Sequence, residues 1–122
     1  MVSEDKLKEY RRGWEKRKRE KEEIIRQKKK AGRKKAYRIS QLLKNKYQAQ
    51  RVILFGSLSQ KSEHPVHQRT DIDIAFRAQN YDFFELFGEA SDIAEPFQVD
   101  LVPLEEASSA LKNRIKYYGE EI

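Results

Sequence analysis

The sequence has no cysteine and only two histidines, and no long apolar run interrupts its charged residues. The absence of cysteine excludes a disulfide framework, a thiolate metal site and a cysteine nucleophile. Two histidines cannot make a zinc site unaided, so any metal ion must be bound by oxygen ligands. No segment approaches the roughly 20 apolar residues of a membrane-spanning helix, and the charged N-terminus lacks the apolar part of a signal peptide. We therefore expect a cytoplasmic protein without membrane contact.

Charge is distributed unequally along the chain. Residues 1–47 contain 19 Lys and Arg and 7 Asp and Glu, whereas residues 48–122 contain 7 and 13, which gives net charges of +12 and −6. This split is typical of a basic arm joined to an acidic domain rather than of a uniformly basic nucleic-acid-binding fold. We place the boundary near residues 31–35, with a basic helical extension at residues 1–32 and one domain at residues 33–122.

The extension is expected to be a long helix with little apolar surface. Residues 4–30 are mostly good helix formers without proline, which predicts a helix about 40 Å long. Leu7, Tyr10 and Trp14 share one face through their spacing of three and four residues. The favoured interpretation is that this helix lies along a partner protein. Contact with RNA or DNA through residues 1–35, or a solubilising role alone, are the alternatives.

After residue 35 the apolar pattern predicts a domain of alternating helices and strands. The apolar spacing indicates a helix, two strands, a helix, a strand and a helix, in this order at about residues 37–47, 51–55, 70–76, 81–95, 97–102 and 105–118. In the second strand, the alternation places Ile72 and Ile74 on one face and Asp71 and Asp73 on the other. The fold class is therefore α/β or α+β, with a small mixed sheet covered by helices.

Asp71 and Asp73 are the first candidate site residues. Residues two apart on a strand lie about 6.6 Å apart on one face, so both carboxylates reach the same space. Two such acids repel each other, and a divalent cation offsets the repulsion. Because Mg²⁺ prefers oxygen ligands, the pair is predicted to bind Mg²⁺, although a solvated strand face is the simpler explanation of two acids taken alone.

Gly56, Ser57 and Asp100 extend this candidate site. Gly56 and Ser57 follow the first strand, where a glycine lets the backbone approach a phosphate and free amides and the Ser57 hydroxyl can donate to it. A plain structural turn is the alternative. Asp100 is flanked by Val99 and Leu101 in the third strand, a position that also suits an acid in a surface salt bridge.

Three segments together resemble the minimal nucleotidyltransferase (MNT) family of the polymerase-β-like superfamily. They are Leu54–Ser57, Thr70–Ile74 and Val99–Val102, and Asn113–Gly119 looks like the C-terminal helix of that family. The resemblance covers residues 35–122 and implies a nucleotidyltransferase-like fold.

The resemblance also implies roles for the candidate residues. Asp71 and Asp73 would bind Mg²⁺ that bridges the triphosphate of ATP, and Gly56 and Ser57 would hold the phosphates. Asp100 would be the third carboxylate, which completes the metal site or accepts the proton of an attacking hydroxyl. The implied reaction transfers AMP to that hydroxyl and releases pyrophosphate.

The small size of the domain suggests that another macromolecule supplies the acceptor. Many minimal nucleotidyltransferases are similar to antitoxins that transfer AMP to a tyrosine of a HEPN ribonuclease toxin. The chain has no arginine followed four to six residues later by His-x-Tyr, so the HEPN toxin is expected as a separate chain in a hetero-oligomer.

The loop between Ser57 and Asp71 departs from the family pattern. It has thirteen residues where the family usually has ten, and Leu-Ser-Gln-Lys stands in the place of a family arginine. Lys61 or Arg69 would then supply positive charge to the nucleotide, whereas His64 and His67 are expected to be exposed. The alternative function is a non-catalytic module that neutralises a toxin by binding it, or that binds nucleic acid through the basic helix.

Overall fold

A computed structural model describes residues 3–62 and 70–122 of the chain. The elements along the chain, with η marking short 3-10 helices, are α1 (Glu4–Asn45), β1 (Arg51–Phe55), η1 (Gly56–Leu58), β2 (Ile72–Arg77), α2 (Phe83–Ala94), β3 (Val99–Pro103), η2 (Leu104–Glu106), α3 (Ser109–Tyr118) and β4 (Glu120–Glu121). The predictions made for Arg69, His64 and His67 concern residues that lie outside the described ranges. None of the helices in the described part of the chain combines the length and the apolar character needed to cross a membrane.

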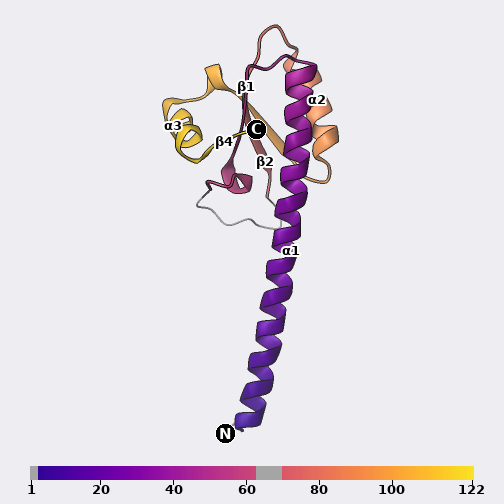
Figure 1. The fold of residues 1–122 in the computed structure, drawn as a ribbon, viewed down its shortest axis with the longest axis vertical. Helices are drawn as coiled ribbons and strands as arrows, with labels where there is room; N and C mark the ends of the chain where they lie inside the picture. The colour runs from indigo at the N-terminus through magenta and orange to yellow at the C-terminus, as the bar shows by residue number, and fades with distance from the viewer. Residues whose placement is uncertain (1–2, 63–69) are drawn as a thin grey trace.

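The long helix α1 passes along one side of the sheet and projects well beyond it (Figure 1). The sequence pattern indicated two helices, at residues 4–30 and 37–47, but the structure has one unbroken helix. Gly32 does not interrupt it, since one glycine costs a helix only about 1 kcal/mol and its neighbours are good helix formers. A β-carbon at Gly32 would lie 2.9 Å from the Leu58 side chain, so the glycine permits close contact between α1 and η1.

The four strands form one mixed sheet in the order β3-β2-β1-β4. β1 pairs antiparallel with β2 and β4, whereas β2 and β3 are parallel and are connected through α2. The predicted mixed sheet is confirmed, and so is the predicted order of β1, β2 and β3 along the chain. β4 was not predicted, because a strand of two residues carries no readable alternation.

The ends of two helices are set by side-chain caps. The Asp82 carboxylate accepts hydrogen bonds from the backbone N–H groups of Phe84 and Glu85 and begins α2. α3 begins at Ser109 rather than at residue 105, because residues 104–106 form η2 and the Ser108 hydroxyl caps the helix. Both helices therefore start later than the apolar pattern indicated.

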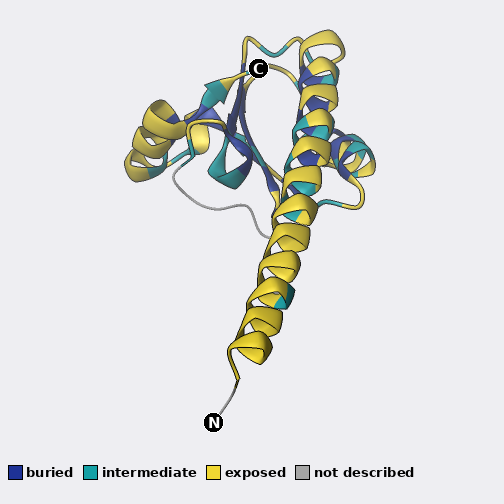
Figure 2. Ribbon diagram, turned by 60° about the horizontal axis from the view of Figure 1, so that its bottom comes forward, coloured by how far each residue is buried: buried dark blue, intermediate teal, exposed yellow. Residues whose placement is uncertain are grey.

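Apolar side chains cover both faces of the sheet. On the face toward α1 and α2, the main core includes Ile39, Leu43, Leu54, Ile72, Ile74, Phe76 and Leu86. On the opposite face, α3 packs over a smaller cluster made of Ile53, Ala75, Leu104 and Ile115. Figure 2 shows buried residues in the sheet and in the part of α1 beside it, while the projecting part of α1 is exposed.

Candidate active site

The strand register places Asp73 at the centre of the candidate site. Asp73 pairs with Phe55 of β1 on one side and with Asp100 of β3 on the other. Partners in adjacent strands lie about 4.8 Å apart and direct their side chains to the same face. Asp73 alternates with Ile72 and Ile74, so it shares the α3 side of the sheet with Ala75. The structure thus brings Asp73 and Asp100 together.

Gly56 lies directly against the Asp73 carboxylate. A β-carbon built on Gly56 would clash with Asp73 Oδ2, and the backbone φ of +71° is one that residues with side chains rarely adopt. Both the space and the backbone angle therefore require glycine here. The predicted turn after β1 is present as η1, and the Ser57 hydroxyl beside it has no hydrogen-bond partner among the described residues.

The acids around Asp73 change its ionisation. Burial, together with the negative charges of Asp100 and Asp71, raises the pKa of Asp73 to about 6. The positive charge of Arg114 acts in the opposite direction. An acid in this position holds a proton more readily than usual, and a cation brought to the site would favour its ionised form.

Arg114 is a site residue to which sequence reasoning assigned no role. It belongs to α3, which crosses the face of the sheet that carries Asp73. The signal available in the sequence was an arginine in the helix that follows the third strand, within the segment that resembles the C-terminal helix of the family. Its nearness to Asp73 depends on how α3 packs, which no local pattern gives.

Asp71 stands one residue before β2 and is exposed. It borders a cavity of about 740 Å³ whose other walls include Lys35 of α1 and Phe97. Its charge reaches Asp73, as the raised pKa of Asp73 shows. Asp71 therefore lies at the margin of the site, between the carboxylate pair and α1.

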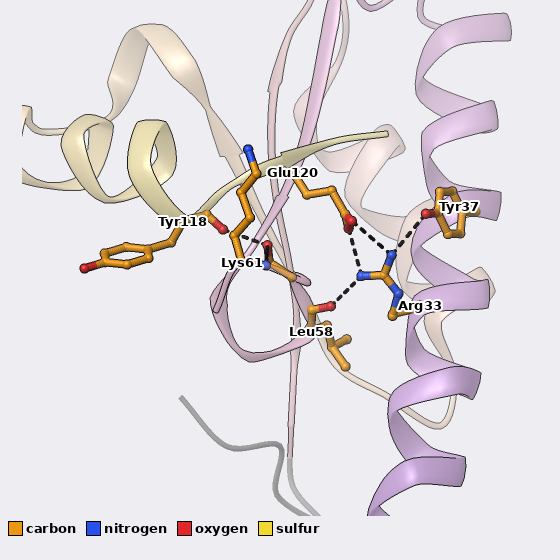
Figure 3. A network of polar contacts seen from close by, with 7 residues as sticks. Arg33, Tyr37, Leu58, Lys61, Tyr118 and Glu120 are labelled. Carbon is orange, nitrogen blue, oxygen red and sulfur yellow. Dashed lines mark hydrogen bonds and ion pairs between the residues drawn. The ribbon is translucent and has the colours of Figure 1, made fainter. Parts of the chain in front are cut away.

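Lys61 does not face the carboxylates. Its side chain lines a separate cavity together with Arg51, Lys116 and other residues, and it is not among the charges that shift the pKa of Asp73. In Figure 3 the Lys61 side chain extends toward the region between α3 and β4. The nucleotide contact of Lys61 stays a prediction.

The segment after Ser57 is held by contacts with α1 and with residues near the C-terminus (Figure 3). Arg33 Nη1 donates to the Leu58 carbonyl at 2.7 Å and to Glu120 Oε1 at 2.8 Å. The Ser59 hydroxyl donates to the Tyr118 carbonyl at 2.6 Å. These bonds hold η1 between α1 and the last strand, which positions Gly56 against Asp73.

The donor set of the site fits a hard divalent cation. In residues 3–62 and 70–122, no group of three or more His, Cys, Asp or Glu side chains is arranged so that it could hold a metal ion. Mg²⁺, however, is usually bound by one or two carboxylates together with water and substrate phosphates. Asp73 with Asp100 or Asp71 supplies such carboxylates, and the metal-binding role of all three stays a prediction.

Comparison with solved structures finds this fold in toxin–antitoxin complexes. A toxin–antitoxin structure with AMP-PNP is 33% identical, with a TM-score of 0.57 over 70% of this chain and 70% of that chain. The MntA-HepT toxin–antitoxin structure is 29% identical, with a TM-score of 0.53 over 73% of this chain and 69% of that chain. A structure of a tri-AMPylated Shewanella oneidensis HEPN toxin in complex with MNT antitoxin is 28% identical, with a TM-score of 0.53 over 74% of this chain and 70% of that chain.

No curated protein matches the sequence. A protein family described as "Polymerase beta, Nucleotidyltransferase" matches residues 37–122, which include Gly56, Ser57 and the three carboxylates. The match covers more than half of the chain and all of the sheet. The chain therefore belongs to the polymerase β nucleotidyltransferase family, and its neighbours among solved structures are MntA antitoxins of HEPN–MNT toxin–antitoxin systems.

Proposed function

We propose that the protein is an antitoxin that transfers AMP from ATP to a tyrosine hydroxyl of a separate HEPN ribonuclease toxin, with Mg²⁺ as cofactor, in the cytoplasm. The observation that carries this proposal is the position of Asp73 between the glycine turn at Gly56 and the parallel partner Asp100. A phosphate-binding turn next to paired carboxylates is the arrangement that nucleotidyl transfer needs. The related complexes with AMP-PNP and with a tri-AMPylated HEPN toxin support the same reaction.

Each residue of the site has a role in the proposed reaction. The backbone at Gly56 and the free Ser57 hydroxyl would bind phosphate oxygens of ATP, since the glycine leaves no side chain in the way. Asp71, Asp73 and Asp100 would hold Mg²⁺, which when bound neutralises charge on the phosphates and polarises them. Arg114, whose charge already reaches Asp73, would add positive charge on the α3 side.

The transfer itself is a displacement at phosphorus. The tyrosine oxygen of the toxin forms a bond to the α-phosphorus of ATP, and the bond from that phosphorus to the bridging oxygen of the β-phosphate breaks. Pyrophosphate leaves with the electron pair of the broken bond. The hydroxyl proton passes to a carboxylate, for which Asp100 is our candidate because it is exposed beside Asp73. The products are AMP-tyrosine and pyrophosphate.

The projecting part of α1 would bind the toxin. Leu7, Tyr10 and Trp14 are each more than half exposed and share one side of the helix. Exposed aromatic side chains of this kind are typical anchors of protein interfaces. Contact of residues 1–35 with RNA or DNA is the less favoured proposal, because glutamates are mixed with the basic residues over much of this helix.

The direct test uses ATP labelled at the α-phosphate, Mg²⁺ and the product of the adjacent gene, which the proposal expects to be a HEPN protein. Wild-type protein should label the HEPN protein, and Asp71→Asn/Asp73→Asn should abolish the label. The matched control is Asp92→Asn/Glu95→Gln, which removes two exposed acids at the far end of α2 and should leave labelling unchanged. Equal labelling by wild type and the site variant would exclude these carboxylates from the reaction.

A second candidate function is neutralisation by binding alone. The observation that favours it is that Leu58 and Ser59 are buried and bonded to α1 and to Tyr118, so they are not available to a nucleotide. Lys61 also faces away from the carboxylates. A protein of this kind would bind the HEPN protein and suppress its ribonuclease activity without ATP, and no label would be transferred.

A further inference from the structure

A cavity of about 610 Å³ on the α3 side of the sheet is surrounded by cationic side chains. Among the described residues, its charged lining consists of five cations and one acid, namely Arg51, Lys61, Arg77, Lys112, Lys116 and Glu121. They come from β1, β2, α3, β4 and the segment after η1, so the tertiary fold brings them together. The net charge of this lining is +4.

This concentration of positive charge runs against the composition of the domain. Residues 48–122 contain 13 Asp and Glu and only seven Lys and Arg. Five of those seven cations line this one cavity. Cations placed only for solubility would be expected to spread over the acidic surface, where they would find partners.

Most of these cations have no counter-charge in residues 3–62 and 70–122. Arg51 Nε donates to Glu121 Oε1 at 2.8 Å. Arg77, Lys112 and Lys116 make no ion pair with any residue of the described ranges, and neither does Lys61. The cavity therefore has an excess positive charge that a bound anion would neutralise.

Two of the cations are direct neighbours in the sheet. Arg51 and Arg77 are partners in the register of β1 and β2. Like charges directly opposite each other destabilise a strand pair. The bond from Arg51 to Glu121 offsets one of the two charges, whereas Arg77 has no such partner among the described residues.

The cavity is distinct from the carboxylate site. Arg77 lies four residues along β2 from Asp73, which corresponds to about 13 Å at the rise of a strand. On α3, Lys112 and Lys116 are four residues apart and share a face, whereas Arg114 points to another side of the helix. α3 thus presents one side to the acids and another to the cavity.

We propose that this cavity is a second anion site, which binds a polyphosphate chain carried by a nucleotide or free in solution. Its volume falls within the range of small-molecule pockets, about 300–1,000 Å³. A phosphate chain concentrates several negative charges within a few ångströms, whereas carboxylates on one face of an extended peptide are about 6.6 Å apart. Arginine forks and lysine ammonium groups are the usual ligands of phosphate oxygens.

The test is calorimetric titration of the full chain with inorganic tripolyphosphate and with ATP, both in excess EDTA. Without a divalent cation, the charges of the carboxylate site repel a phosphate chain, and binding that survives Asp71→Asn/Asp73→Asn does not depend on that site. The outcome is therefore separable from that of the proposed AMP transfer. Wild type should bind one tripolyphosphate per chain. Arg77→Gln/Lys116→Gln, two exposed positions, should weaken binding at least about tenfold by removing charge-assisted hydrogen bonds.

Two further variants make the test specific. Lys30→Gln/Lys34→Gln removes the same charge from exposed positions of α1 and should change the affinity less than about twofold. Asp71→Asn/Asp73→Asn should still bind tripolyphosphate. Tighter binding of ATP than of tripolyphosphate assigns the cavity to a nucleotide, and equal binding assigns it to the phosphate chain alone.

Three results would overturn the proposal. They are the absence of tripolyphosphate binding, an equal loss in the cavity and α1 variants, and binding of an RNA oligonucleotide that depends on Arg77 and Lys116 but is not displaced by tripolyphosphate. A thermal melt of each variant confirms that the altered protein is folded.

Discussion

The first and last parts of α1 have the same backbone conformation but very different surroundings. Before Ala31 the large apolar side chains Leu7, Tyr10, Trp14 and Ile24 are exposed, whereas Gly32, Ala36, Ile39 and Leu43 are buried against the sheet. In the exposed part, Glu23 bonds to Arg26 and Gln27 one turn further on. Local propensity and pairs of this kind are enough to continue a helix that has already begun in the core. The projecting part is therefore helical without being part of the folded core.

The largest expected difference between the two parts comes from truncating one isoleucine in each. Ile39→Ala should lower the free energy of unfolding by about 2–5 kcal/mol, because Ile39 is fully buried and its removal leaves a cavity. Ile24→Ala changes the same residue type in the same helix at a position 47% exposed, and should cost less than about 0.5 kcal/mol. Urea titration of both variants measures the two values. Equal losses would mean that the projecting part is packed as tightly as the core.

The next largest effect concerns an ion pair in each part. Arg33 and Glu120 are mostly buried, with side-chain exposures of 13% and 16%, and hydrogen bonding to Glu120 raises the pKa of Arg33. Arg33→Met or Glu120→Gln should each lower the free energy of unfolding by about 1–3 kcal/mol, since the remaining partner loses its counter-charge.

The exposed pair of Arg26 and Glu23 is the matched control. Their side-chain exposures are 70% and 51%, so Arg26→Met should cost less than about 0.5 kcal/mol. Double-mutant cycles for the two pairs separate the pair interaction from the loss of each side chain alone. A coupling energy as small for Arg33 and Glu120 as for the exposed pair would contradict the role given to this junction.

The sequence was sufficient for the parts of the fold that depend on local pattern. The alternation around Ile72 and Ile74 predicted β2 and the side on which Asp73 lies, and the resemblance placed Asp100 beside it. The continuity of α1 through Gly32 was missed, because the change from exposed to buried residues was taken as the end of one helix and the start of another. Burial changed there, but the backbone did not.

Other features depend on residues far apart in the chain. Arg33 and Glu120 are separated by 87 positions, and no periodicity connects them. A contact with the nucleotide was predicted for Lys61 from its place after Ser57, but the sequence could not show that its side chain lines a cavity with Arg51 and Lys116. Arg114 likewise reaches Asp73 only because α3 crosses the sheet. Such contacts follow from tertiary packing, so the sequence supplied the site carboxylates but not the charges around them.

Replacement of Asp73 is expected to change the free energy of unfolding less than the substitutions at Ile39 and Arg33, and to increase it rather than lower it. Its pKa of about 6 is higher than the usual 3.8, so the folded protein binds a proton more tightly than the unfolded chain does. Stability contributed by this proton is complete below about pH 4 and is lost as the pH rises through about 6. Asp73→Asn should therefore raise the free energy of unfolding at pH 7 by about 1–2 kcal/mol and leave it unchanged near pH 4.

Magnesium provides the control for this prediction. Saturating Mg²⁺ should stabilise the wild type at pH 7 and have little effect on Asp73→Asn, because the ion takes the place of the proton at the carboxylates. Thermal melts of both proteins at pH 4 and pH 7, with and without Mg²⁺, measure these differences. A variant less stable than the wild type at pH 7 without metal would show that Asp73 serves the fold rather than the site.

The smallest change in stability is expected in the projecting part of α1, at Trp14. This side chain is 58% exposed, and the Lys18 ammonium group lies 5.4 Å from the centre of its ring. Trp14→Ala should therefore alter the free energy of unfolding by less than about 0.5 kcal/mol.

If the projecting helix binds the HEPN protein, the same variant should weaken that complex by about 2 kcal/mol, close to thirtyfold in affinity. Phe84→Ala removes an aromatic side chain that is 85% exposed on α2 and serves as the matched control. Titration of the HEPN protein with both variants measures the two affinities. A loss of affinity confined to Phe84→Ala would show that the domain, and not the projecting helix, forms the interface.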